Sequence, residues 1–105
     1  MLFRSVMLYA IISHDVENSL EKRKGARPDH IARLNQLLDQ GRLILAGPHP
    51  SIDVSEPGDA GFSGSLIVAE FDDLHQARQW AYADPYVTAG VYSSVVVKPF
   101  NKVLP

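Results

Sequence analysis

Residues 6–13 read Val-Met-Leu-Tyr-Ala-Ile-Ile-Ser, and the fold follows from this stretch. The segment is rich in β-branched and aromatic residues, which is typical of a β-strand. Its side chains are apolar on both sides: Val6, Leu8, Ala10 and Ile12 form one set, and Met7, Tyr9 and Ile11 form the other. A strand of this kind needs apolar cover on both faces of its sheet.

The segments that follow alternate between strand and helix patterns. After the first strand we expect a charged turn at 20–24, a helix at 28–40, strands at 42–46 and 65–71, a helix from residue 74, a helical turn at 85–90 and a strand at 91–100. The connection at 47–64 is long and rich in proline and glycine, which is typical of a lid or mobile loop. This β-α-β-β-α-β order predicts an α+β fold with a ferredoxin-like antiparallel sheet.

Local signals mark where the helices begin and end. Asn18 and Asp73 each precede a Glu or Gln by three residues, which is the pattern of a capping box at a helix start. Gly25 is expected to end the charged turn, and Pro28 suits the first position of the main helix. Gly41 is the expected C-terminal stop of that helix.

The two predicted helices can cover only one face of the sheet. The strand at 91–100 is also apolar on both sides, with Val95 and Val97 on one side and Tyr92 and Val96 on the other. A second copy of the chain is the economical cover for the remaining face. We therefore predict a homodimer in which sheet packs against sheet.

The composition is that of an ordinary globular protein. The chain has 105 residues, a formal net charge of −2 at pH 7 and no cysteine. Its length predicts a single domain at residues 7–105, preceded by an N-terminal extension at residues 1–6. The slightly acidic balance gives no reason to expect nucleic acid as a partner. The apolar run at 7–12 is far shorter than a membrane span, and without an export signal we expect a cytoplasmic protein.

Metal and cofactor sites are not indicated by the residue pattern. The histidines at 14, 30, 49 and 75 show no ligand spacing, and no thiolate ligand is present. Glycine-rich phosphate-binding loops are missing from the sequence. We therefore expect neither a metal nor a cofactor.

Residues 27–30, Arg-Pro-Asp-His, place an imidazole near the predicted start of the main helix. His30, Leu34 and Leu37 share one helical face, which we expect to point inward. A buried histidine needs a polar partner or a ligand, and Asp84 is the candidate partner. Two interpretations stay open. The pair forms a general base oriented by an aspartate, or His30 is a core residue while Asp84 caps the turn that follows it.

The charge of His30 is also left open by the sequence. A position near a helix N-terminus disfavours the imidazolium form because of the helix dipole. A neighbouring carboxylate at Asp84 favours that form and fixes the tautomer of the ring.

Two further side chains are candidates for substrate contacts. Arg27 lies one turn from His30 and could hold an anionic group, or it belongs with Lys-Arg-Lys at 22–24 to a solvated basic face. Ser65 could offer a hydroxyl to the site, or it is only the first residue of a strand. Trp80 and Tyr86 are spaced for packing in the core.

An ordered set of short motifs over residues 7–103 resembles the YciI family, whose members carry the YCII-related domain. The motifs are Tyr9-Ala10, Ser19-Leu20-Glu21-Lys22-Arg23, Arg27-Pro28-Asp29-His30, Arg33-Leu34, Gly41-Arg42-Leu43, Ala46-Gly47-Pro48, Ala60-Gly61-Phe62, Gly64-Ser65, Ala83-Asp84-Pro85-Tyr86, Ala89-Gly90-Val91-Tyr92 and Val97-Lys98-Pro99-Phe100. The chain departs from the family pattern at Asn101, where a lysine is expected.

The resemblance implies a dimeric α/β barrel made of two ferredoxin-like subunits. It also implies a cleft centred on a histidine and an aspartate, which match His30 and Asp84. Relatives of the family include a dehydrochlorinase of chlorinated aromatic breakdown, and muconolactone isomerase shares the fold. These relatives favour proton-transfer chemistry on a small cyclic or phenolic acid.

The leading hypothesis is therefore a small cofactor-free enzyme of the lyase, dehydrochlorinase or isomerase type. In it, Asp84 orients His30, His30 moves a proton, and Arg27 and Ser65 contact a small anionic substrate. The alternatives are a module that binds a small molecule without turning it over, and a dimeric interaction module.

Overall fold

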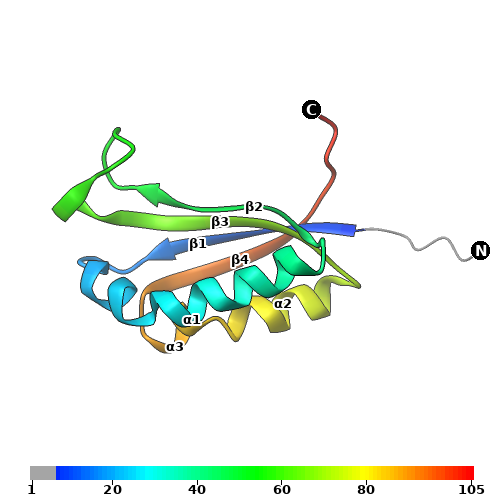
Figure 1. Ribbon diagram of the computed structural model, residues 1–105, viewed down its shortest axis with the longest axis horizontal. Coiled ribbons are helices and arrows are strands. Elements are labelled where there is room, and N and C mark those ends of the chain that lie inside the picture. Colours follow the sequence, from blue (N-terminus) through cyan, green and yellow to red (C-terminus); the bar gives the residue numbers. More distant parts are fainter. Residues whose placement is uncertain (1–6) are drawn as a thin grey trace, which may run out of the picture.

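The computed structural model describes residues 7–105, which form one four-stranded sheet with helices packed on it. The elements in chain order are β1 (Met7–Asp15), α1 (Leu20–Asp39), β2 (Leu43–Pro50), the short 3-10 helix η1 (Gly58–Ala60), β3 (Phe62–Phe71), α2 (Leu74–Tyr82), α3 (Pro85–Thr88) and β4 (Tyr92–Phe100). The strand order is β2-β3-β1-β4, and neighbouring strands are antiparallel (Figure 1). This is the predicted α+β fold with a ferredoxin-like sheet. The expected N-terminal extension, residues 1–6, lies outside the described residues.

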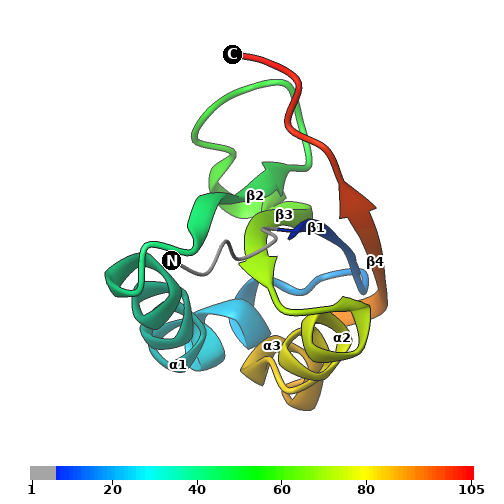
Figure 2. The ribbon, with the colours of Figure 1, turned by 90° about the vertical axis from the view of Figure 1, so that its right-hand side faces the viewer.

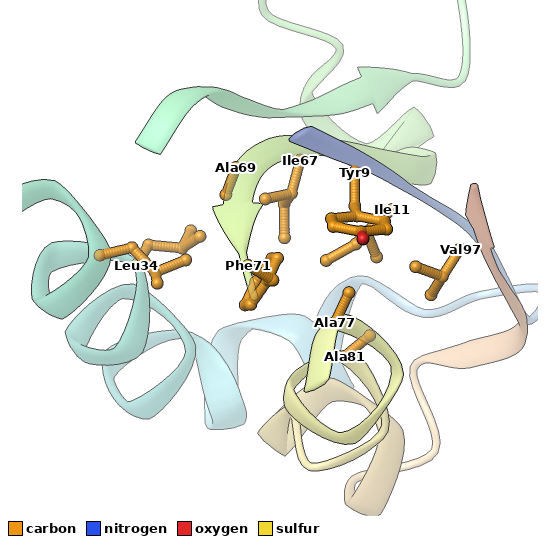
Figure 3. Close-up of a cluster of buried hydrophobic side chains, with 10 residues drawn as sticks. Tyr9, Ile11, Leu34, Ile67, Ala69, Phe71, Ala77, Ala81 and Val97 are labelled. Atoms are coloured by element: carbon orange, nitrogen blue, oxygen red, sulfur yellow. The ribbon is translucent and has the colours of Figure 1, made fainter. Parts of the chain in front are cut away.

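The helices α1, α2 and α3 lie on one face of the sheet, as the end-on view in Figure 2 shows. Apolar side chains from both layers meet between them, and each large aliphatic or phenylalanine side chain contributes about 1.5–3 kcal/mol when fully buried. The core contains Tyr9, Ile11, Leu34, Leu37, Ile67, Ala69, Phe71, Ala77, Ala81 and Val97 (Figure 3). The helix layer therefore covers only one of the two apolar sides of β1.

The other face of the sheet, here called the open face, is apolar as well. Cross-strand partners share a face, so the register places Ile12 of β1 beside Leu66 of β3 and Val96 of β4, away from the helices. The open face comprises Leu8, Ala10, Ile12, Leu45, Leu66, Val68, Val96 and Phe100. Val96 is 40% exposed and Phe100 is 41% exposed. An apolar patch of this kind is typical of an interaction surface.

The first helix is longer than the sequence pattern predicts. α1 runs through Gly25 and Pro28, which were expected to separate a charged turn from the main helix. The expected capping box is also wrong, because Ser19 is the N-cap residue and its hydroxyl donates to Asp15 at 2.6 Å. Pro28 removes the N–H that would bond to the carbonyl of residue 24, but both positions are exposed, so water can satisfy that carbonyl. Buried contacts of Arg23 hold the first turns of the helix in place.

None of the described helices has both the length and the apolar character needed to cross a membrane.

The long connection predicted at 47–64 is largely a β-hairpin. β2 extends to Pro50 and β3 begins at Phe62, so residues 51–61 connect the two strands and include η1. Proline is tolerated in β2 because an edge strand has backbone N–H groups that need no partner strand. Ser65 consequently lies inside β3 and not at its start. The cap predicted at Asp73 is confirmed, since its carboxylate accepts from the N–H of Gln76 at 2.8 Å.

Gly64 occupies a position in β3 where no side chain fits. A Cβ atom there would collide with the carbonyl oxygen of Ser13 and lie 3.3 Å from Nδ1 of His49. We expect Gly64→Ala to lower the free energy of unfolding by about 1–3 kcal/mol, because the neighbouring strands must move apart. Chemical denaturation measures this change. Gly47→Ala in β2, where a Cβ atom meets open space, is the matched control. Equal losses in the two variants would contradict the explanation.

Candidate active site around His30 and Asp84

His30 and Asp84 lie against each other although 54 positions separate them in the chain. His30 projects from α1 toward the core, and Asp84 is the N-cap residue of α3; they are 7% and 3% exposed. The imidazole Nδ1 lies 2.9 Å from each carboxylate oxygen of Asp84. Oδ1 of Asp84 also accepts from the N–H of Tyr86 at 2.9 Å and thereby caps α3. Asp84 is therefore a helix cap and a partner of the histidine at the same time.

His30 lies in the middle of α1, because the helix begins at Leu20. The expected effect of the helix dipole on its charge is therefore wrong, since that effect is confined to the first turn. The carboxylate of Asp84 remains as the group that orients the ring. A carboxylate only accepts hydrogen bonds, so Nδ1 carries the proton and donates it to Asp84. In the neutral ring, Nε2 is then the basic nitrogen.

The ring of Tyr86 fixes the plane of this imidazole. The two ring centroids are 3.9 Å apart and the planes differ by 9°, so the rings are stacked. Tyr92 in turn meets Tyr86 edge-on, with centroids 5.5 Å apart. Tyr86 is buried as the sequence predicts, but it also lines a cavity, so its role is not confined to the core. The turn at 84–86 supplies both the carboxylate and the ring that hold the histidine.

Arg23 contradicts the prediction that residues 22–24 form one solvated basic face. It is 6% exposed, and its Nε and Nη2 donate to Asp15 at 2.6 and 2.9 Å. Nη2 also donates to the carbonyl of Gly64 at 3.0 Å and to the hydroxyl of Ser65 at 2.9 Å. Burial acts to lower the pKa of Arg23, but the hydrogen bond and charge of Asp15 outweigh burial, and the pKa is raised.

The only sequence signal for this buried role was the residue type. An arginine fork matches a carboxylate with two parallel bonds, which the flanking lysines cannot do. Lys22 and Lys24 are exposed, as predicted, and Lys24 makes an exposed pair with Glu21 at 3.3 Å.

A cavity of about 430 Å³ opens beside His30, between α1 and the strands β2 and β3. Its described lining includes the basic side chains of Arg23, Lys24 and Arg27, and no carboxylate. The remaining lining residues are mainly apolar: Leu20, Ile31, Leu34, Ala46, Gly47, Pro48, Phe62 and Ile67, together with Ser65 and Tyr86. A pocket of this size with apolar walls and a few polar groups is typical of a small-molecule site. Its charge favours an anion.

The structure brings all four predicted site residues to this one region. His30, Arg27 and Ser65 line the cavity, and Asp84 supports His30 from behind. Ser65 is 4% exposed, its oxygen accepts a hydrogen bond from Arg23, and its hydroxyl lies near that of Tyr92. Arg27 is exposed on α1. The residues that sequence reasoning missed are Arg23 and its partner Asp15.

The hydroxyl of Tyr92 is buried and makes no hydrogen bond of good geometry with a described residue, although the hydroxyl of Ser65 is close enough to act on its pKa in the lowering direction. Burial raises the pKa of Tyr92 to about 12, compared with 10.0 for the ordinary phenol, and the charge of Asp84 acts in the same direction. An unpartnered buried hydroxyl is destabilising, because it gives up hydrogen bonds to water and gains none in return.

We expect Tyr92→Phe to be at least as stable as the parent protein at pH 7, because the variant buries no unpartnered hydroxyl. The raised pKa of Tyr92 adds a pH dependence: the folded protein keeps the phenol proton where the unfolded chain loses it. Stability therefore falls as the pH rises from about 10 to 12. Denaturation across this pH range measures the unfolding free energies of both proteins. As the pH rises, the parent protein should lose more stability than Tyr92→Phe. A constant difference would contradict the assignment.

The fold and the site together are those of a member of the YCII-related domain family. The model of the YCII-related domain matches residues 7–101, and the chain belongs to this family. Protein YciI of Escherichia coli O6:H1 (strain CFT073) is 58% identical over 97 residues, which cover 92% of this chain and 99% of that protein. An uncharacterized protein of Haemophilus influenzae is 53% identical over the same share of each chain. The predicted resemblance to the YciI family is confirmed.

A solved structure of an enzyme has the same fold. It is 5-chloro-2-hydroxyhydroquinone dehydrochlorinase (TftG) from Burkholderia phenoliruptrix AC1100, in complex with 2,5-dihydroxybenzoquinone. The TM-score is 0.79, and the match covers 90% of this chain and 94% of that chain at 23% identity. At this identity the likeness establishes the fold alone.

Proposed function

We propose that this protein is a small enzyme that works without a cofactor and moves a proton on a small, cyclic, anionic substrate. Asp84 orients His30, and Nε2 of His30 removes the proton or returns it. Arg27 and Ser65 contact the substrate from the cavity wall. The observation that carries the proposal is the buried His30–Asp84 pair beside a cavity with basic side chains and no described carboxylate in its lining.

The reaction class follows from what an imidazole base can do. His30 takes a proton from a C–H or O–H bond of the substrate, and the electron pair left behind forms a new double bond. In a lyase reaction this electron pair expels a leaving group such as chloride, and in an isomerase reaction the proton returns at another carbon. The structural neighbour is named as a dehydrochlorinase and holds a cyclic dihydroxy quinone, which supports a lyase or isomerase reaction on a ring compound.

A ligand screen that includes a histidine variant tests this function. The parent protein and His30→Ala are screened by thermal shift against small aromatic acids, lactones and hydroxyquinones. Each stabilising compound is then followed by NMR in D₂O for consumption or deuterium uptake. We expect at least one compound that the parent protein turns over or exchanges and that His30→Ala leaves unchanged.

The other outcomes of the screen each contradict the proposal in a different way. Equal turnover by His30→Ala would exclude His30 as the base. A compound that raises the melting temperature and is never consumed or exchanged would favour a non-catalytic binding module. A panel without any stabilising compound would favour an interaction module.

We also propose that two copies of the chain form a homodimer through the open face, and that the protein is cytoplasmic. The helices α1, α2 and α3 cover the opposite side of the sheet, and the open face carries large exposed apolar side chains such as Val96 and Phe100. Packing two such faces together would remove both from water and produce the dimeric α/β barrel that the sequence resemblance implies.

Val96→Asp is expected to convert this dimer into a monomer at micromolar concentration. The substitution would bury an unpaired carboxylate between the two sheets, which costs several kcal/mol. Sedimentation velocity measures the change. Leu38→Asp is the matched control, because Leu38 lies on α1 and is 56% exposed. A parent protein that sediments as a monomer, or dissociation of both variants, would contradict the proposed interface.

A further inference from the structure

The guanidinium of Arg23 has hydrogen-bond donors that the fold does not use. Nε and Nη2 bond to Asp15, Gly64 and Ser65. Nη1 is not used by these partners, although the phenol of Tyr86 lies within hydrogen-bonding reach of the guanidinium. Because Arg23 lines the cavity while its Nε–Nη2 edge faces Asp15, Nη1 is the part of the guanidinium left to face the open space. Nη1 carries two N–H groups, so even with one directed to Tyr86 the other is available to a ligand.

The position of Arg23 relative to His30 is set by one ring. The guanidinium carbon lies 5.1 Å from the centroid of Tyr86, and the imidazole of His30 stacks on that same ring at 3.9 Å. Phe62 flanks the guanidinium as well, with its centroid 5.2 Å from the carbon. Cation–π contacts of this kind hold a guanidinium plane in place. Arg23 and His30 line the same cavity, so a ligand that contacts Nη1 can extend to the proposed base.

We propose that Arg23 binds the anionic oxygen of the substrate, and that this substrate is a flat ring compound with an acidic hydroxyl or a carboxylate. The inference rests on the proposed function of the same cavity. The ring would pack on the apolar wall formed by residues such as Phe62 and Ile67. With its anionic oxygen on Nη1 of Arg23, the ring presents its reacting proton to His30.

Arg23 is better suited to this task than Arg27, the arginine that the sequence suggests. Arg27 is exposed and must lose side-chain freedom when it binds an anion. Arg23 is already immobilised by Asp15 and Ser65, so binding costs less conformational entropy. Asp15 acts as a positioning residue, because it holds the guanidinium and does not line the cavity.

A pair of probes that differ in charge tests the inference. The first probe is 2,5-dihydroxybenzoquinone, whose hydroxyls are conjugated to carbonyls and are therefore acidic. The second is 2,5-dimethoxybenzoquinone, which has the same ring and no acidic hydroxyl. Affinities are measured by isothermal titration calorimetry for the parent protein and for four variants. Asp15→Asn/Arg23→Gln removes both charges of the buried pair, Arg23→Lys and Arg27→Gln probe the two arginines separately, and Arg78→Gln on α2 is the exposed control.

We expect the parent protein to prefer the acidic probe. Asp15→Asn/Arg23→Gln should lose at least about 10-fold in affinity for the acidic probe, as expected for a hydrogen bond to a charged group. Its affinity for the dimethoxy probe should change by less than about 3-fold, because that probe offers no anion to Arg23. Arg23→Lys keeps the charge and should lie between, and Arg78→Gln should match the parent. Melting temperatures show whether each variant is folded. If Asp15→Asn/Arg23→Gln is unfolded, the affinities of Arg23→Lys for the two probes are compared with those of the parent protein instead.

Equal losses for the two probes, or no preference of the parent protein for the acidic probe, would overturn the inference. A stronger loss in Arg27→Gln than in Arg23→Lys would move the anion site to Arg27. The proposed function can fail while the anion site at Arg23 remains supported. In that case His30→Ala keeps its turnover, but the parent protein still prefers the acidic probe and this preference still depends on Arg23. Conversely, His30→Ala can lose turnover while the Arg23 variants bind both probes as the parent protein does. That result would overturn the anion site and leave the proposed function supported.

Discussion

Asp84→Asn is expected to lower turnover by about 10²–10⁴-fold while leaving the fold intact. Asparagine is a good N-cap residue, so its amide oxygen can still accept from the N–H of Tyr86 and cap α3. The amide carries no charge to stabilise the imidazolium that forms when His30 takes a proton, and it does not impose the same tautomer on the ring. The substitution therefore separates the two tasks of this side chain.

Initial rates with a substrate from the ligand screen measure the effect, and the melting temperature verifies the fold. Asp73→Asn is the matched control, because Asp73 caps α2 through the N–H of Gln76 but is exposed at the surface. We expect this control to keep the activity of the parent protein. If Asp84→Asn retained more than about a tenth of the parent rate, the carboxylate would have no essential part in the chemistry.

Asp15→Ala is expected to lower the free energy of unfolding by about 3–5 kcal/mol. The side chains of Arg23 and Asp15 are 8% and 1% exposed, so removal of the carboxylate leaves a guanidinium charge buried without its partner. Ser19 loses the acceptor of its hydroxyl in the same variant. A loss of this size is a large part of the about 5–15 kcal/mol that stabilises a typical domain.

Urea denaturation measures this loss. Glu21→Gln is the control, because it breaks the ion pair between Glu21 and Lys24 of the same helix, in which both side chains are exposed. This substitution should change the free energy of unfolding by less than about 1 kcal/mol. Asp15→Asn/Arg23→Gln should recover part of the loss, because it leaves no unpaired charge in the interior. Equal stability of Asp15→Ala and Glu21→Gln would show that the buried pair does not hold the start of α1.

Most of the fold could be predicted because the hydrophobic pattern of each element is unambiguous. β1 is apolar at every position from Met7 to Ile12, and the inner face of α1 repeats at His30, Leu34 and Leu37. The same reasoning located His30 and Asp84, since a histidine on an inward face requires a polar partner. Periodicity is local to the sequence, and it places His30 on an inward face; the partner 54 positions away was a candidate that the family resemblance supported.

The predictions that failed depend on contacts between distant segments. Gly25 and Pro28 are helix breakers by their intrinsic preferences, but the contact of Arg23 with Asp15 holds the preceding turns in the helix. In the sequence, Arg23 is one charge in a basic run. Its partners belong to β1 and β3, and the local sequence does not identify them. The inner ends of the hairpin strands, residues 47–50 and 62–64, were assigned to the connection because proline and glycine disfavour central strands, although an edge strand tolerates proline.

Arg23 and His30 project from the same side of one helix, seven residues apart. With a rise of about 1.5 Å per residue, their backbone attachment points are about 10.5 Å apart along the axis. Regular hydrogen-bonded backbone fixes this interval, so the length of the ligand proposed to bridge the two side chains would not depend on the surrounding loops. The spacing of seven residues leaves the two side chains about 20° apart around the helix axis, and insertion of one residue would place them about 80° apart and abolish the alignment.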